Sequence, residues 1–271
     1  MMLRALVFLV LLGLAPSARG AERVARIVID PGHGGSKTGA LGTGEQLEKG
    51  LVLQIALRLR ERLEEETGAQ VYLTREKDAL VHLPDRVTFA NGKRPDLFMS
   101  IHANSMPTRK LRERVEGIET YFLSAAASGA GARATADREN ADAPRAQAVQ
   151  NDSTLNFILN DLVRMDAHAG SSRLAYAIHQ RLIASTGASD RGVLQAPFFV
   201  LTGVEAPAVL IEVGYISHPQ EGARLARAEY QEKLVSAITS GVKDFLKDLR
   251  KRDAPSAADS ETPQAAAPTS P

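Results

Sequence analysis

A histidine between glycines is the residue best suited to chemistry in this 271-residue sequence. His33 follows the β-branched run at 26–30 and stands in the sequence Asp-Pro-Gly-His-Gly-Gly at 30–35. Glycine on both sides lets the backbone take positive φ angles and removes bulk around the imidazole. A turn of this kind at the carboxyl end of a strand is where α/β folds usually hold their binding sites. The pattern predicts that His33 binds a ligand or takes part in catalysis.

A second histidine has the same kind of position. His102 lies at the end of the apolar run 97–103, and two imidazoles at one sheet edge can converge on one metal ion. Catalytic zinc takes three protein ligands and keeps one position open. The chain has no cysteine, so an acid must complete the set if no further histidine fits. Glu48, in the first turn of the helix predicted after the glycine loop, is the preferred third ligand, with Glu45 as the alternative. Without the two histidines, Glu48 would be interpreted as an acid that complements the helix dipole.

Another acid lies inside a very apolar run. Glu212 is the lone carboxylate of residues 208–216, and burying such a group is unfavourable unless it is paired or functional. Beside a metal-bound water it can accept a proton and later donate it to a leaving amine. A structural ion pair is the alternative interpretation. The remaining histidines lie in loops or polar helical regions and are predicted to be surface residues: His82, His168, His179 and His218.

The elements that must position these side chains alternate along the chain. Apolar runs predict strands at 26–30, 71–74, 97–103, 117–123 and 208–216. Apolar residues at helical spacing predict helices at 47–66, 84–90, 155–165, 172–185 and 229–250. Alternation of this kind predicts one α/β domain, with a mixed and mostly parallel sheet flanked by helices. We expect this catalytic domain to span residues 21–252.

The two ends of the sequence differ from the rest. Residues 1–20 are typical of a secretory signal peptide: a positive residue, an apolar stretch too short to span a bilayer, and small residues before a predicted cleavage after Gly20. An uncleaved anchor is the alternative. Cleavage leaves 31 basic and 32 acidic residues, a net charge of −1, which argues against a nucleic-acid partner. The stretch 253–271 is rich in Ala, Pro and Ser and is predicted to be a disordered tail.

Five motifs, in this order, resemble the zinc-dependent N-acetylmuramoyl-L-alanine amidases of the Amidase_3 type. They lie at 30–35, 48–49, 74–75, 100–104 and 207–217, and the resemblance extends over about 26–250. It implies a monomeric peptidoglycan hydrolase that cuts the amide between N-acetylmuramic acid and L-alanine. It also implies one Zn²⁺ held by His33, Glu48 and His102, with Glu212 as the catalytic glutamate. The alternatives are a zinc peptidase that cuts inside the stem peptide and a non-catalytic wall-binding protein.

Residues from about 124 to 170 are more than the simplest members of that family need. They resemble the insertion of Gram-negative cell-division amidases, in which an added helix covers the active site until an activator, usually with a degenerate LytM domain, displaces it. The resemblance implies a periplasmic enzyme that splits the septal wall. It also suggests that Glu139 occupies the open zinc position and that the apolar face of 155–165 docks the activator. An ordinary surface helix is the alternative.

Overall fold

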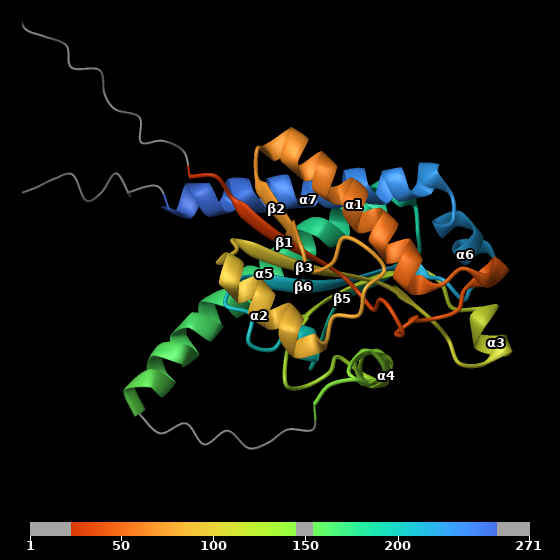
Figure 1. Cartoon of the computed structure of the whole chain (residues 1–271), viewed down its shortest axis with the longest axis horizontal. Helices are drawn as coiled ribbons and strands as arrows, with labels where there is room; N and C mark the ends of the chain where they lie inside the picture. Colours follow the sequence, from red (N-terminus) through yellow and green to blue (C-terminus); the bar gives the residue numbers. More distant parts are fainter. Residues whose placement is uncertain (1–22, 145–153, 254–271) are drawn as a thin grey trace, which may run out of the picture.

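The computed structural model describes residues 23–144 and 154–253, except the side chains of 154–166 and 253. A six-stranded sheet forms its centre, in the order β2-β1-β3-β6-β4-β5 (Figure 1). The strands are β1 (Arg26–Pro31), β2 (Gln70–Leu73), β3 (Leu97–Asn104), β4 (Ile118–Leu123), β5 (Asp190–Ala196) and β6 (Ala208–Tyr215). The predicted signal peptide and nearly all of the predicted tail lie outside the described residues.

The helices occupy the connections between these strands, and two more follow the last strand. They are α1 (Glu48–Thr67), α2 (Leu83–Lys93), α3 (Arg109–Arg112), α4 (Ala130–Glu139), α5 (Thr154–Thr186), α6 (Pro219–Leu225) and α7 (Ala228–Asp253), with short 3₁₀ turns η1 (Thr43–Glu45) and η2 (Phe199–Leu201). Helix α1 ends where Gly68 takes a left-handed φ of 65°. No helix in the described part of the chain has the length and apolar character to cross a membrane.

Strand direction divides the sheet into two parts. β2, β1, β3 and β6 run parallel, whereas β4 runs antiparallel to β6 and β5 runs parallel to β4. Four strands therefore end at the edge where β4 and β5 begin. This arrangement confirms the predicted single α/β domain with a mixed, mostly parallel sheet. Strand β5 was not predicted, because most of its residues are only half-buried or exposed and its sequence lacks an apolar run.

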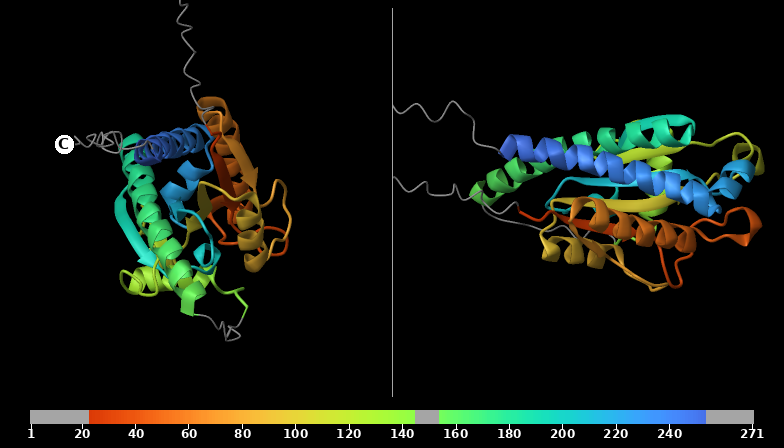
Figure 2. Two further views of the ribbon diagram at one scale, coloured as in Figure 1. Left: turned by 90° about the vertical axis from the view of Figure 1, so that its left-hand side faces the viewer. Right: turned by 90° about the horizontal axis from the view of Figure 1, so that it is seen from above.

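Helices cover both faces of the sheet (Figure 2). The apolar side chains of α1, α5 and α7 pack on one face with Ile27 and Ile29, and α2, η2 and α4 pack on the other with Val28. Because side chains alternate between faces along a strand, the same alternation places a set of buried polar residues on the α4 face. These are Asp30, Ser100, His102, Asn104, Glu119 and Glu212.

The insertion differs from its prediction in two ways. Helix α4 was not predicted, because residues 124–150 carry few large apolar side chains; the helix is held instead by Ala132 and Ala136, which pack in the cluster on this face. The two helices predicted at 155–165 and 172–185 form one helix, α5. Gly170 does not interrupt this helix. It packs closely against Pro207, because a Cβ at Gly170 would lie 2.6 Å from Cγ of Pro207.

Two histidines predicted at the surface are buried. His179 lies between the Thr120 hydroxyl, 3.0 Å from Nδ1, and an oxygen of Asp190, 2.8 Å from Nε2. His218 begins α6, where its Nδ1 accepts a hydrogen bond from the backbone N–H of Glu221. The prediction for His179 was wrong because a polar sequence neighbourhood does not show which helix face is covered. The prediction for His218 was wrong because this loop residue caps a helix and is buried there. His82 and His168 are exposed, as predicted.

Candidate metal centre and active site

The loop after β1 holds His33 in an uncommon backbone conformation. His33 itself has a φ of 59°, followed by Gly34 at 120° and Gly35 at 58°. Gly34 and Lys37 exchange two backbone hydrogen bonds of 2.8 and 3.0 Å, which close the turn. Three consecutive residues with positive φ reverse the chain beyond the strand and direct the imidazole toward the sheet edge. The glycines therefore serve the turn, as the sequence indicated.

Two arginines fix the carbonyl groups of this loop. Arg75 donates to the carbonyl oxygens of Pro31 and Gly32, at 2.9 and 2.7 Å. Arg86 donates to the carbonyl oxygen of His33 and to Oδ1 of Asp30, both at 2.6 Å. Burial raises the pKa of Asp30, but the adjacent Arg86 guanidinium and hydroxyl donors outweigh it and lower that pKa below its ordinary value.

Sequence reasoning missed Arg86. A basic residue near the start of a helix normally indicates a solvated face, yet this side chain is buried. No local signal in the sequence distinguishes it from an ordinary surface arginine.

Glu48 reaches the same edge from the opposite layer. It is the first residue of α1 and is 2% exposed. Its Oε2 accepts the backbone N–H of Ala40 at 2.8 Å, and its Oε1 accepts the backbone N–H of Ala103 at 3.0 Å. The carboxylate is thereby fixed between the glycine loop and β3. The alternative acid, Glu45, lies exposed in η1.

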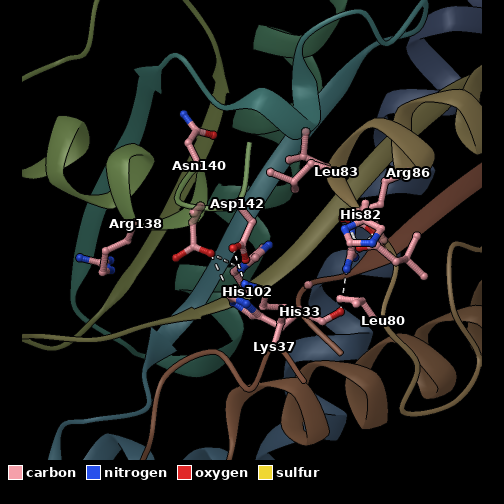
Figure 3. Close-up of a pocket in the computed structure, with 15 residues that line it drawn as sticks. His33, Lys37, Leu80, His82, Leu83, Arg86, His102, Arg138, Asn140 and Asp142 are labelled. Atoms are coloured by element: carbon pink, nitrogen blue, oxygen red, sulfur yellow. Dashed lines mark hydrogen bonds and ion pairs between the residues drawn. The ribbon is translucent and has the colours of Figure 1, made fainter. Parts of the chain in front are cut away.

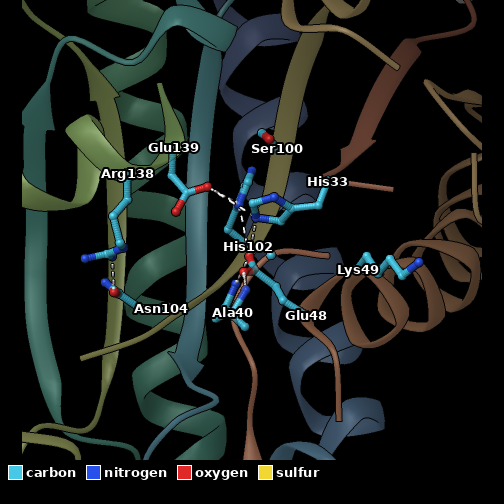
Figure 4. Close-up of polar contacts among 12 residues, drawn as sticks. His33, Ala40, Glu48, Lys49, Ser100, His102, Asn104, Arg138 and Glu139 are labelled. Carbon is cyan, nitrogen blue, oxygen red and sulfur yellow. Dashed lines mark hydrogen bonds and ion pairs between the residues drawn. The ribbon is translucent and has the colours of Figure 1, made fainter. Parts of the chain in front are cut away.

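Four donor atoms converge at this edge (Figure 4). His33 Nε2 lies 3.0 Å from Glu48 Oε1 and 3.3 Å from Glu139 Oε2. His102 Nδ1 lies 3.1 Å from each of these two oxygens. All four atoms lie within 4.8 Å of one another. Tetrahedral zinc with bonds of about 2.0–2.1 Å would separate its ligand atoms by about 3.4 Å, so these spacings fit one ion at the centre.

The hydrogen bonding of the cluster supports the same interpretation. Although buried and close to each other, Nε2 of His33 and Oε2 of Glu139 make no hydrogen bond within the described residues. Buried polar atoms are nearly always paired, so unpaired ones require an explanation. A metal ion between these atoms would satisfy both of them.

Two glycines make room for the cluster. A Cβ at Gly32 would lie 2.3 Å from Cε1 of His102. A Cβ at Gly39, which has a φ of 67°, would lie 2.5 Å from Oε2 of Glu48. Any larger residue at either position would displace a candidate ligand. These positions are therefore part of the site, although their side chains supply no donor atom.

The electrostatics of the cluster favour positive charge at its centre. Burial lowers the pKa of His33, but the carboxylates of Glu48 and Glu139 outweigh it and raise that pKa to about 9. The pKa of His102 lies well above its ordinary value for the same reason. The pKa of Glu48 is lowered, because the two imidazoles outweigh the effect of its burial.

Glu212 lies beside this cluster without belonging to it. It pairs in register with His102 across β3 and β6 and is fully buried. Neither of its carboxyl oxygens has a hydrogen-bond partner among the described residues. Burial, and then the charge of Glu139, raise its pKa well above the ordinary value. No ion pair satisfies it within the described part of the chain, which argues against the structural alternative; unpaired acids with raised pKa values are typical of catalytic sites.

A second buried glutamate in the neighbouring strand escaped the sequence analysis. Glu119 pairs in register with Glu212 across β4 and β6. It accepts hydrogen bonds of 2.7–2.9 Å from four side chains on four different strands: Asn104, Tyr121, Arg191 and Tyr215. Its position inside the predicted strand 117–123 was a usable signal, identical in kind to that of Glu212. Glu119 joins the strands that line the edge.

Helix α4 carries Glu139 into the centre and is tied down around it. Arg138 donates to Oδ1 of Asn104. Asn140 donates to the carbonyl oxygen of Pro197 and accepts the backbone N–H of Phe199, both at 2.7 Å. The side chain of Glu139 is 10% exposed. The helix thus closes the cleft over the two histidines.

Cavities remain on both sides of this helix. One of about 50 Å³ lies against His33, His102 and Glu139. One of about 780 Å³ lies beside β5 and α3 and is lined by Glu119, Tyr215 and residues of α4. Arg138 lines both of them. Arg138 therefore lies between the two cavities.

Comparison with known proteins gives the family. The family model for N-acetylmuramoyl-L-alanine amidase matches residues 27–244. AmiA of Escherichia coli K12 is 36% identical over 230 residues, 84% of this chain and 77% of the relative. AmiC of E. coli O6:H1 is 33% identical over 238 residues, 87% of this chain but 56% of the relative, so the chain spans little more than half of that protein.

Solved structures agree with the fold. An N-acetylmuramoyl-L-alanine amidase from Clostridium difficile 630 has 27% identity and a TM-score of 0.64, over 83% of this chain and 98% of that chain. AmiC2 of Nostoc punctiforme has 29% identity and a TM-score of 0.62, over 82% and 97%. The sequence match, the shared fold and the His/Glu cluster agree: this chain belongs to the N-acetylmuramoyl-L-alanine amidase family and is an amidase of that type.

Proposed function

We propose that this chain hydrolyses the amide between N-acetylmuramic acid and L-alanine in peptidoglycan as a zinc enzyme. His33, Glu48 and His102 are the metal ligands, and Glu212 is the catalytic acid and base. The observation that carries the proposal is the convergence of the donor atoms beside a buried carboxyl group that has no partner among the described residues. Bound zinc would polarise the scissile carbonyl and lower the pKa of a coordinated water toward about 7.

The protein's own residues hold the geometry and move the proton. Glu48 is oriented by two backbone N–H groups, and the His33 loop is held by Arg75 and Arg86. Glu212 accepts a proton from the attacking water and donates it to the departing L-alanine nitrogen. Because neither oxygen of Glu212 has a hydrogen bond to break within the described residues, the carboxylate is free to accept that proton.

Helix α4 keeps the enzyme closed at rest in this proposal. Glu139 takes the fourth donor position, which water or the scissile carbonyl must occupy for turnover. The cavity left at the ligands, about 50 Å³, holds little more than a solvent molecule. A sugar-peptide substrate therefore needs α4 to move away.

The cellular setting is proposed from the sequence and the relatives together. Export through the signal peptide at 1–20 places the enzyme in the periplasm of a Gram-negative bacterium, where it splits the septal wall. A LytM-type activator then displaces the insertion at about 124–170, by docking on the apolar face of 155–165. The side chains of that face lie outside the described residues.

Digestion of purified sacculi tests the function. We expect a Glu139→Ala variant to release stem peptides that begin with an intact L-alanine amino group, identified by mass spectrometry, and a chelator to stop the release. Fragments cut inside the stem would indicate a peptidase instead. No release by this variant, with metal bound, would favour a non-catalytic wall-binding protein.

A matched pair on one helix tests the resting state. Glu139→Ala removes the acid at the centre, whereas Asp137→Ala removes an exposed acid two residues earlier. A lost contact of about 1.4 kcal/mol shifts the ratio of open to closed protein about tenfold. We expect at least that gain in activator-free turnover for Glu139→Ala and none for Asp137→Ala. Equal turnover of both variants and the unmodified chain would contradict autoinhibition.

A further inference from the structure

Lys37 lines the same small cavity as the two histidines (Figure 3). The two hydrogen bonds between Gly34 and Lys37 join it to the His33 turn. The turn is fixed again at Gly35, whose N–H donates to Asp78 at 2.7 Å and whose carbonyl accepts from Lys49 at 2.8 Å. The backbone that carries the Lys37 side chain is therefore fixed relative to His33.

The partner of this lysine belongs to the covering segment. Lys37 Nζ forms an ion pair with Oδ1 of Asp142, three residues beyond Glu139. Two arginines also line the cavity, but Arg86 is buried and paired with Asp30, and Arg138 is carried by α4 itself. Movement of the covering segment would carry Arg138 away and leave Arg86 paired with Asp30. Among the lysines and arginines that line this cavity, Lys37 is therefore the one that would remain in place without its carboxylate partner.

The two acids of the covering segment thus occupy two positions of the cleft. Glu139 is at the donor centre, where the scissile carbonyl must bind, and Asp142 is at Lys37. A substrate that enters the same cleft replaces the first contact with its carbonyl group. A substrate with a carboxylate a short distance along its chain replaces the second contact as well.

We propose that Lys37 binds a carboxylate of the stem peptide on the leaving-group side of the scissile amide, and that Asp142 occupies this subsite while α4 is closed. This rests on the proposed function. The muramic acid carboxyl group is consumed in the scissile amide, so the free carboxylates of an N-acetylmuramoyl peptide lie on its peptide side. Lys37 is thereby a specificity-determining residue that favours acidic stems over amidated ones.

Solvent limits the size of the effect. The Lys37 side chain is 45% exposed, so the contact is partly screened. An exposed ammonium–carboxylate contact of this kind is expected to change KM by about two- to fivefold and to weaken with added salt. Because Lys37 does not touch the scissile amide in this proposal, kcat is expected to stay the same.

The test uses the full chain with both covering acids removed, Glu139→Ala with Asp142→Ala, so that release of the cover cannot contribute. Two soluble N-acetylmuramoyl peptides serve as substrates. One carries a free carboxylate on the residue after L-alanine, and the other carries an amide there. Adding Lys37→Ala is expected to raise KM for the acidic substrate only, and Lys37→Arg to restore most of it. Lys247→Ala, an exposed lysine on α7, is the matched control and should change neither KM.

Each other outcome has a definite meaning. If Lys37→Ala changes KM equally for both substrates, or for neither, the proposed role of Lys37 is wrong. Turnover by the double variant would still support the proposed function in that case. Lys37→Ala could instead raise turnover only in the otherwise unmodified chain and have no effect in the double variant. Lys37 would then serve only to hold the covering segment closed through Asp142, and the subsite proposal would be wrong. No turnover of either substrate in the background would overturn the proposed function itself, and this proposal with it.

Discussion

Replacing Gly32 by alanine should disable the centre through one methyl group. The added Cβ would lie 2.3, 2.5 and 2.7 Å from Cε1, Nε2 and Nδ1 of the His102 ring. Ordinary van der Waals contact begins near 3.4 Å, so the ring must shift by about 1.1 Å, the difference between 3.4 and 2.3 Å. Gly32 has no positive φ, so the effect is purely one of contact.

A shift of this size exceeds what the site tolerates. Metal–ligand distances are tolerated to within about 0.2 Å, and a misplacement of about 1 Å in an active site can reduce the rate about 100-fold, which corresponds to about 2.7 kcal/mol. We therefore expect Gly32→Ala, in the Glu139→Ala background, to lose at least about 100-fold in kcat/KM on sacculi. Metal affinity, measured by calorimetry, should fall with it.

Gly92→Ala is the matched control. Gly92 lies in α2, and a Cβ there has no neighbour within 4 Å among the described residues. The activity and metal affinity of the Gly92→Ala variant should equal those of the Glu139→Ala background. Its melting temperature should be slightly higher, because alanine favours the helix. Gly32→Ala with undiminished metal affinity and turnover would refute the steric reasoning and would mean that His102 can bind the metal from a different ring position.

Three further results follow from the buried groups. Glu212→Gln should lower turnover by about 10²–10⁴-fold, the usual contribution of a general acid and base, while the metal content measured by elemental analysis stays the same. Asp30→Asn should lower the free energy of unfolding, measured in urea, by about 3–5 kcal/mol, since it leaves Arg86 buried without its partner. Because the pKa of Asp30 in the folded state lies below its unfolded value of 3.8, this contribution is complete above pH 3.8 and is lost as pH falls through the folded-state pKa, so the two proteins should converge in acid. Gly241→Ala should destabilise by about 1–3 kcal/mol in the same urea assay, because its Cβ would lie 2.5 Å from Cα of Ile178 and force α7 from α5; unaltered unfolding would contradict this close packing.

The sequence was most informative about the site where a polar residue lay within an apolar strand or between the glycines of a loop. His33, His102 and Glu212 stand at or near the carboxyl ends of strands, and the parallel pairing that places them at one edge follows from the alternation of strands and helices. Glu48 needed the histidines to single it out, because an acid in a first helical turn has an ordinary explanation. These residues are close together in the structure as the fold prediction requires.

The rest depended on tertiary contacts that leave little local trace. Arg86 resembles any helix-surface arginine until the loop carbonyls fold against it. Helix α4 is alanine-rich, so its burial comes from how closely it approaches the sheet rather than from a strong apolar stripe. His179 is polar on a helix whose covered face depends on β4 and β5, and β5 itself had no apolar run. Glu119, by contrast, was predictable by the logic applied to Glu212.

The loop that carries His33 is irregular, yet many of its polar groups are occupied. Five of its amides donate to partners on β3, on the loop itself, at Asp78 and on α1: those of Gly32, Gly34, Gly35, Lys37 and Ala40. Its carbonyl groups accept from two buried guanidinium groups. Such a segment should exchange its amide hydrogens with solvent as slowly as the sheet does. Little conformational entropy then remains to be lost when an ion or a substrate binds, so this part of the binding free energy is supplied during folding rather than at the moment of association.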